Sequence, residues 1–150
     1  MRTFTGRFAI FALMLFPVVA DATSRFDGKW ETVLTCEQFK DARGFSWAFT
    51  SEIKDGKLRG VYGIEHQSAS IRIEGPIAED GSAQLLATVW TGDKVYVPGN
   101  DTPKGTEFTY RIKAEFKDAE GKGTRIEGRP CACTFKRDWD FGGGFIGIRR

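Results

Sequence analysis

The sequence has few of the residues on which most catalytic and metal sites depend. It contains a single histidine, His66, and no serine or cysteine lies in a recognisable nucleophile motif beside it. One imidazole and a Cys-x-Cys pair fall short of a tetrahedral metal site. Glu79, Asp80, Asp118 and Glu120 lie in predicted turns, where acidic residues serve backbone geometry. We therefore predict that the protein is not an enzyme and has no metal or cofactor site.

The chain also lacks a strong charge of one sign. Its formal net charge is +2, and lysine and arginine alternate with acidic residues along the chain. Nucleic-acid binding needs a concentrated basic surface, which this composition does not provide. After the N-terminal residues no stretch is apolar enough for a transmembrane helix. We expect no nucleic-acid partner and no membrane span in the mature form.

The N-terminus has the pattern of a signal peptide. Arg2 and Arg7 precede an apolar run over residues 8–19, and Ala20-Asp21-Ala22 is a small-x-small cleavage site. The alternative is an uncleaved anchor. The expected organisation is a signal peptide at 1–22, one domain at 23–137 and a Gly-rich tail at 138–150. An exported protein, periplasmic or secreted, follows from cleavage after Ala22.

Most of the remaining chain alternates apolar and polar residues with the period of β-strands. The predicted strands are 26–36, 45–53, 58–64, 70–77, 83–90, 108–116, 122–128 and 129–136. Asp55-Gly56 between two of them predicts a type I′ hairpin turn. Gly60 and Gly63 suggest a bulge, a bend or a close backbone approach. No amphipathic helix of useful length is present.

Eight short strands joined mostly by tight turns predict an all-β fold, either a small antiparallel up-and-down barrel or a β-sandwich. We favour the barrel because the last strand can pair with the first, which leaves no exposed edges. The longest irregular segment is the loop 91–106, in which residues 95–97 could form a short edge strand or a lid. Thr124 and Ile126 are both expected to face inward, with a bulge at 128–130 restoring the parity of Cys131.

The three cysteines lie in the predicted mature chain, where export makes a disulfide the default expectation. Cys131 and Cys133 are two residues apart on one strand, a spacing that suits a bond between them badly. Cys36 can therefore pair with Cys131 or with Cys133. The remaining cysteine would be a buried thiol, a reactive thiol or the link in a disulfide-bonded dimer; we expect a monomer, with a Cys133-linked dimer as the alternative.

Several segments together resemble a known group of proteins. These segments are FDGKWETVLTC, DGKLRGVYG, IEGPIAEDGSAQLLA, GTEFTYRIKAEF and GKGTRIEGRPCACTFKR. They look like a family of small exported bacterial β-domains without an established activity. The resemblance extends to Arg137 and implies Cys36–Cys131 as the disulfide, with Cys133 as a free thiol. Gly28-Lys29-Trp30 gives a weaker similarity to avidin-like and lipocalin-like barrels.

Two functions compete at this point. The first is a non-enzymatic binding or inhibitor-like module that captures a protein with the loop 91–106 and one barrel rim. Its candidate binding residues are Trp90, Tyr96 and Trp139, whose aromatic side chains lie outside the expected core or in loops.

The alternative is a carrier of a small apolar ligand inside the barrel. A solid core made by Trp47, Phe49, Phe108 and Tyr110 would exclude it. A hydrolytic enzyme, the third possibility, would require a cleft that brings His66 against an acid or a thiol.

Overall fold

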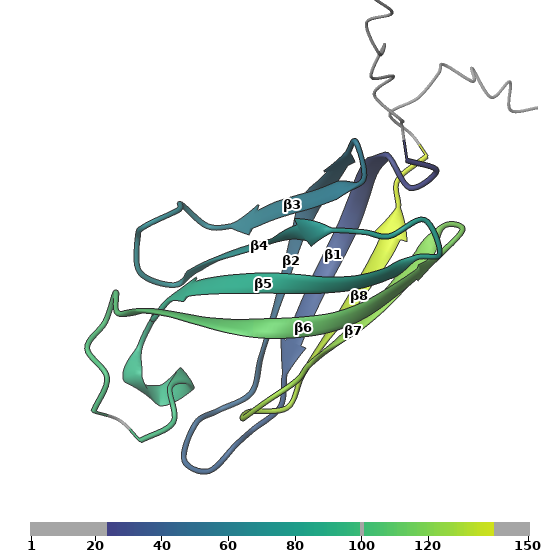
Figure 1. The fold of residues 1–150 in the computed structure, drawn as a ribbon. Coiled ribbons are helices and arrows are strands. Elements are labelled where there is room, and N and C mark those ends of the chain that lie inside the picture. The colour runs from purple at the N-terminus through teal and green to yellow at the C-terminus, as the bar shows by residue number, and fades with distance from the viewer. Residues whose placement is uncertain (1–23, 100, 140–150) are drawn as a thin grey trace, which may run out of the picture.

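The computed structural model describes residues 24–99 and 101–139. They form a closed antiparallel barrel in which each strand pairs with the next and β1 pairs with β8 (Figure 1). The strands are β1 (Gly28–Cys36), β2 (Phe45–Lys54), β3 (Lys57–Tyr62), β4 (Ser70–Pro76), β5 (Ser82–Trp90), β6 (Glu107–Lys117), β7 (Glu120–Arg125) and β8 (Cys131–Arg137). The predicted barrel is confirmed, and the sandwich is excluded. Within the described residues no helix is long and apolar enough to cross a membrane.

The two ends of the barrel are built differently. The turns β2–β3, β4–β5 and β6–β7 are short and lie at one end, together with the N-terminal segment before β1. The loops β1–β2, β3–β4, β5–β6 and β7–β8 lie at the other end, and the first three of them are longer than any of these turns. The predicted Asp55-Gly56 hairpin is confirmed, because both residues have positive φ, at 51° and 72°. We call the two ends the turn end and the loop end.

A solid aromatic core fills the turn end. Phe116 contacts Phe26, Trp30 and Phe135 at ring-centroid distances of 6.0, 5.4 and 4.8 Å. The Trp30 indole donates a hydrogen bond to the Phe26 carbonyl at 2.9 Å, so its one polar atom is satisfied. Gly81 makes this packing possible, because a Cβ there would lie 1.9 Å from the Phe116 carbonyl oxygen. Phe26, Trp30, Phe116 and Phe135 are each at most 2% exposed, so this half of the barrel is tightly packed.

The inward face of β7 differs from the prediction. Thr124 and Ile126 are exposed, and Gly121, Gly123 and Arg125 take the inward positions instead. The reason is space: a Cβ at Gly121 would lie 2.8 Å from the Phe116 ring, and one at Gly123 would lie 2.8 Å from the Ile112 side chain. Neighbouring strands already fill the interior there. β7 therefore brings an arginine into the barrel, and Ile126, one residue beyond its end, is exposed.

Two further expectations need correction at the loop end. Residues 95–97 do not form an edge strand; instead Lys94–Tyr96 is a single 3-10 turn, η1. Ile64 lies beyond the end of β3 and is exposed, because Gly63, with φ 74°, turns the chain out of the strand. At Gly60, of the three predicted alternatives, the close approach is observed: a Cβ would lie 2.0 Å from the Ser51 hydroxyl.

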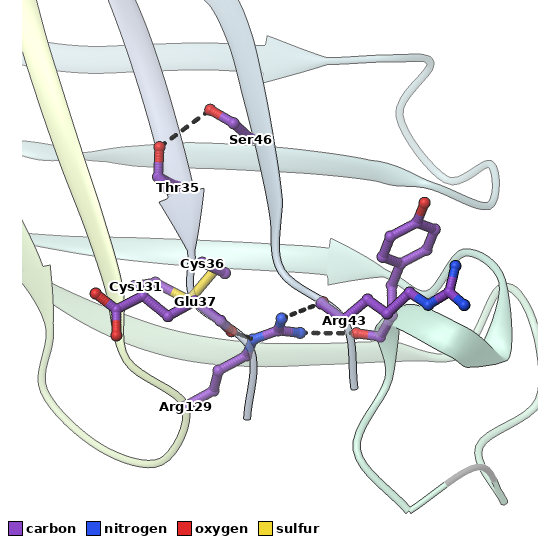
Figure 2. The surroundings of a disulfide bond; sticks show 8 residues. Thr35, Cys36, Glu37, Arg43, Ser46, Arg129 and Cys131 are labelled. Atoms are coloured by element: carbon purple, nitrogen blue, oxygen red, sulfur yellow. Dashed lines mark hydrogen bonds between the residues drawn. A yellow bond between two sulfur atoms is a disulfide. The ribbon is translucent and has the colours of Figure 1, made fainter. Parts of the chain in front are cut away.

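The disulfide joins Cys36 to Cys131 at the loop end, fastening the first strand to the last (Figure 2). The pairing that the family resemblance implied is confirmed, and the bond is intramolecular. Cys133 is a free thiol inside the barrel and only 2% exposed. Burial raises the pKa of this thiol to about 12. Such a thiol is neutral and buried at neutral pH, which disfavours its reaction in the folded protein. The monomer and the Cys133-linked dimer both stay predictions.

We expect the buried thiol to make the fold sensitive to alkali. The folded-state pKa of Cys133, about 12, lies above the ordinary value of 9.0. The contribution of the buried thiol to the free energy of unfolding is therefore complete below pH 9, and it is lost as the pH rises from 9 toward 12. Urea unfolding at a series of pH values should show a steeper loss of stability for the wild type than for Cys133→Ala. The same dependence of stability on pH in the two proteins would contradict the raised pKa of Cys133.

Candidate functional site: an aromatic cavity at the loop end

A cavity of about 690 Å³ opens at the loop end of the barrel. This volume is typical of small-molecule sites. All four loops of the loop end contribute to its mouth. Its inner wall is formed by strand residues: Leu34, Cys36, Phe45, Trp47, Tyr62, Ile71, Val89, Phe108, Tyr110 and Arg125. The cavity is thus the space that the core of the turn end does not occupy.

One wall of the cavity is a row of aromatic rings on β2 and β3. Trp47 stacks on Tyr62 with centroids 4.7 Å apart and planes 9° apart, and it contacts Phe45 at 4.6 Å. Phe45 in turn meets the edge of Tyr96 at 6.2 Å, and Phe49 lies 6.3 Å from Tyr62. Phe45, Trp47 and Tyr62 line the cavity and remain half-buried, and the half-buried Phe49 packs beside Tyr62. They offer flat apolar surface to a guest molecule.

The opposite wall combines aromatic surface with positive charge. β6 stands four strands from β2 around the barrel and carries Phe108 and Tyr110, whose rings are 6.2 Å apart. The Arg125 guanidinium, from the neighbouring β7, lies 4.1 Å from the centre of the Tyr110 ring. Phe108 is 38% exposed, whereas Tyr110 is 9% exposed. The solid core that would have excluded a carrier is therefore absent at this end.

Arg129 holds the mouth of the cavity together. Arg129 is 5% exposed, and its guanidinium donates hydrogen bonds to backbone carbonyls of three residues in two other loops. The acceptors are Glu37 at 2.8 Å, Tyr96 at 2.8 Å and Arg43. Figure 2 shows Arg129 beside the disulfide, reaching Glu37 and Arg43. The β1–β2, β5–β6 and β7–β8 loops are thereby fixed to one another.

The β5–β6 loop is also fixed directly to the β1–β2 loop. The Arg43 amide donates to the Val95 carbonyl at 2.8 Å, and the Gly99 amide donates to the Asp41 carboxylate at 3.0 Å. Thr91 closes the base of the loop, since its hydroxyl donates to Pro103 and accepts from the Thr106 amide. This long segment is therefore an anchored part of the cavity wall.

The structure separates the three predicted binding aromatics. Trp90 faces outward on β5 yet is only 4% exposed, because His66 packs on its ring at 4.8 Å and Glu107 accepts its indole N–H at 3.0 Å. Tyr96 is 42% exposed and lines the cavity. Trp139 is 69% exposed at the turn end, beside Arg137. Only Tyr96 lies at the cavity.

Sequence reasoning missed the importance of Arg125 and Arg129. The signal for Arg125 was the Gly121-x-Gly123-x-Arg125 spacing, which puts the arginine on the same face as two glycines. Arg129 precedes β8 in the Arg-Pro-Cys segment, where only the fold reveals that its side chain turns inward. Across the described ranges 24–99 and 101–139, no group of three His, Cys, Asp or Glu side chains could hold a metal ion.

Comparison with known proteins adds no family to these observations. No family model, no curated protein and no solved structure matches the chain. The resemblances to small exported β-domains and to avidin-like or lipocalin-like barrels therefore stay predictions. Any function has to be argued from the cavity itself.

Proposed function

We propose that the protein is a non-enzymatic carrier that binds a small, largely apolar molecule inside the loop end of its barrel. One observation carries this proposal: the cavity is large enough for a ligand and is lined by aromatic rings that remain half-buried. Apolar sites of this kind gain affinity from the area they remove from water. The anchored loops support the proposal because a preformed site spends little free energy on ordering itself.

A protein-binding module has less support. Its three predicted aromatics do not share a surface, since Trp90 is covered and Trp139 lies at the opposite end from Tyr96. We therefore place the function inside the barrel. We further propose that the carrier is a monomer working outside the cytoplasm, which the intramolecular disulfide and the N-terminal sequence support.

The proposal can be tested with the neutral fluorophore N-phenyl-1-naphthylamine, whose emission rises in apolar surroundings. We expect saturable binding to the wild type and binding at least about tenfold weaker to Val89→Trp, because Val89 faces the cavity and an indole there would occupy it. Leu86→Trp is the matched control: it adds the same side chain to the same strand, on the outer face, where Leu86 is exposed.

Leu86→Trp should bind the fluorophore as the wild type does, and thermal unfolding should show that both variants fold. Absence of binding to the wild type would contradict the proposal. Equal weakening by the two variants, or undiminished binding to Val89→Trp, would place the fluorophore elsewhere and contradict it as well.

A further inference from the structure

The cavity contains a positive charge that nothing in the described chain neutralises. Arg125 faces inward from β7, and its buried Nε has no hydrogen-bond partner among the described residues. No described carboxylate lies within ion-pairing distance of its guanidinium. Its guanidinium lies over the Tyr110 ring, 4.1 Å from the ring centre. Arg125 is half-buried, and a buried donor without a partner costs free energy, which an anionic ligand in the cavity would offset.

Arg129 adds to the positive potential. Its three acceptors are neutral carbonyls, so its charge is hydrogen-bonded but not compensated. Burial lowers the pKa of Arg129, and the nearby Arg125 charge lowers it further. Arginine nevertheless keeps its proton in proteins. Two cations thus line one wall, while the acid at the mouth, Asp93, is paired with Lys104 at 3.3 Å.

The placement of Arg125 leaves its donors available. A guanidinium lying on a ring keeps its N–H groups at its edge, in the plane that binds a carboxylate bidentately. Gly128 keeps that edge accessible, because a Cβ there would lie 3.1 Å from Nη2 of Arg125. Arg125 also borders a second hollow on the outer side, lined by Leu86, residues of β6 and residues 125–128. Glu127 lies 3.9 Å from Arg111 there, and this hollow lacks the row of aromatic rings found inside the barrel. An anion therefore fits best on the barrel side.

We propose that the ligand is an amphiphilic carboxylic acid whose apolar body lies against the aromatic wall and whose carboxylate is bound by Arg125. This inference rests on the proposed carrier function and adds the chemical class of the ligand. The free carboxylate supplies the missing counter-charge, and the rings of Trp47 and Tyr62 cover the rest of the molecule. An uncharged molecule of the same shape would leave the guanidinium unpaired and should bind more weakly.

The test compares 1-naphthaleneacetic acid with 1-naphthaleneacetamide, which have the same shape and differ in charge at neutral pH. Equilibrium dialysis against the full mature protein, with naphthalene fluorescence as the readout, measures each affinity directly. We expect the acid to bind at least about tenfold more tightly than the amide, the advantage of one charge-assisted hydrogen-bonded pair. Arg125→Met should abolish this advantage, so that the acid and the amide bind this variant with equal affinity.

Arg111→Met is the matched control, because it removes the same charge from an exposed position on β6 and should keep the preference. Arg125→Lys keeps the positive charge but loses the bidentate geometry of the guanidinium, and it should keep part of the preference for the acid. This variant provides a second test if Arg125→Met does not fold. Equal binding of acid and amide by the wild type, or a preference that survives in Arg125→Met, would overturn the inference while leaving the carrier proposal standing. Failure of both compounds and of the neutral fluorophore to bind would overturn the two together.

Discussion

Removing the disulfide, in Cys36→Ala/Cys131→Ala, is expected to lower the free energy of unfolding by about 4–5 kcal/mol. The bond joins residues 95 positions apart and so restricts nearly the whole described chain in its unfolded state. It also closes the seam between β1 and β8, the pairing of greatest sequence separation in the barrel. A loss of this size is a large part of the stability of an ordinary domain.

Chemical denaturation at pH 7 measures this loss, and Cys133→Ala is the control. That variant removes a buried sulfur without touching the bond and should cost about 1 kcal/mol, because it deletes one small side-chain atom. Thiol counting provides a second check: the wild type should show one reactive thiol after unfolding and none before. A loss below about 1 kcal/mol for the double variant would contradict the role assigned to the bond.

Replacing Arg129 is the second change with a large expected effect. Arg129→Met should lower the free energy of unfolding by about 2–4 kcal/mol, because three part-buried hydrogen bonds from one charged donor are lost at once. It should also weaken the binding of N-phenyl-1-naphthylamine by about tenfold or more, since the loops at the mouth lose their common anchor. Chemical denaturation and fluorophore titration measure the two effects.

Arg43→Met is the matched control for this change. Arg43 is exposed, and its contact with Arg129 is made through its backbone carbonyl, so the variant removes the same charge but keeps the hydrogen bond. It should change stability by less than about 0.5 kcal/mol. Hydrogen exchange adds a local readout: the Arg43 amide, bonded to the Val95 carbonyl, should lose protection in Arg129→Met. Unchanged exchange there would show that Arg129 does not hold the loops.

The strands were predictable from the sequence because alternation leaves a clear trace where one face is buried. Phe108 to Phe116, for example, alternates as the inward face of β6 requires. The prediction was wrong for β7 because its inward positions are two glycines and Arg125, while the apolar Ile126 lies one residue beyond its end and is exposed. The open cavity was not predictable: parity shows that Trp47 and Tyr62 face inward, but not that they stack along the wall and leave the centre empty.

The register nevertheless contained a usable signal for the cavity. Phe45 begins β2, Tyr62 ends β3 and Phe108 lies near the start of β6, and strand direction alternates around an up-and-down barrel. These inward aromatics therefore had to lie at the same end. The positive charge of the site was harder to foresee, because Arg125 becomes an interior residue only through the glycines that precede it.

The central claim, that the loop end of the barrel is a ligand site, is tested most directly by mapping N-phenyl-1-naphthylamine with amide chemical shifts of the ¹⁵N-labelled protein. The account predicts saturable shifts at the cavity, for example at Tyr62, Tyr96 and Gly128, and none in the filled turn end, for example at Gly81 and Gly121. Shifts centred on the turn end or the outer wall, or no shifts at saturating fluorophore, would contradict it.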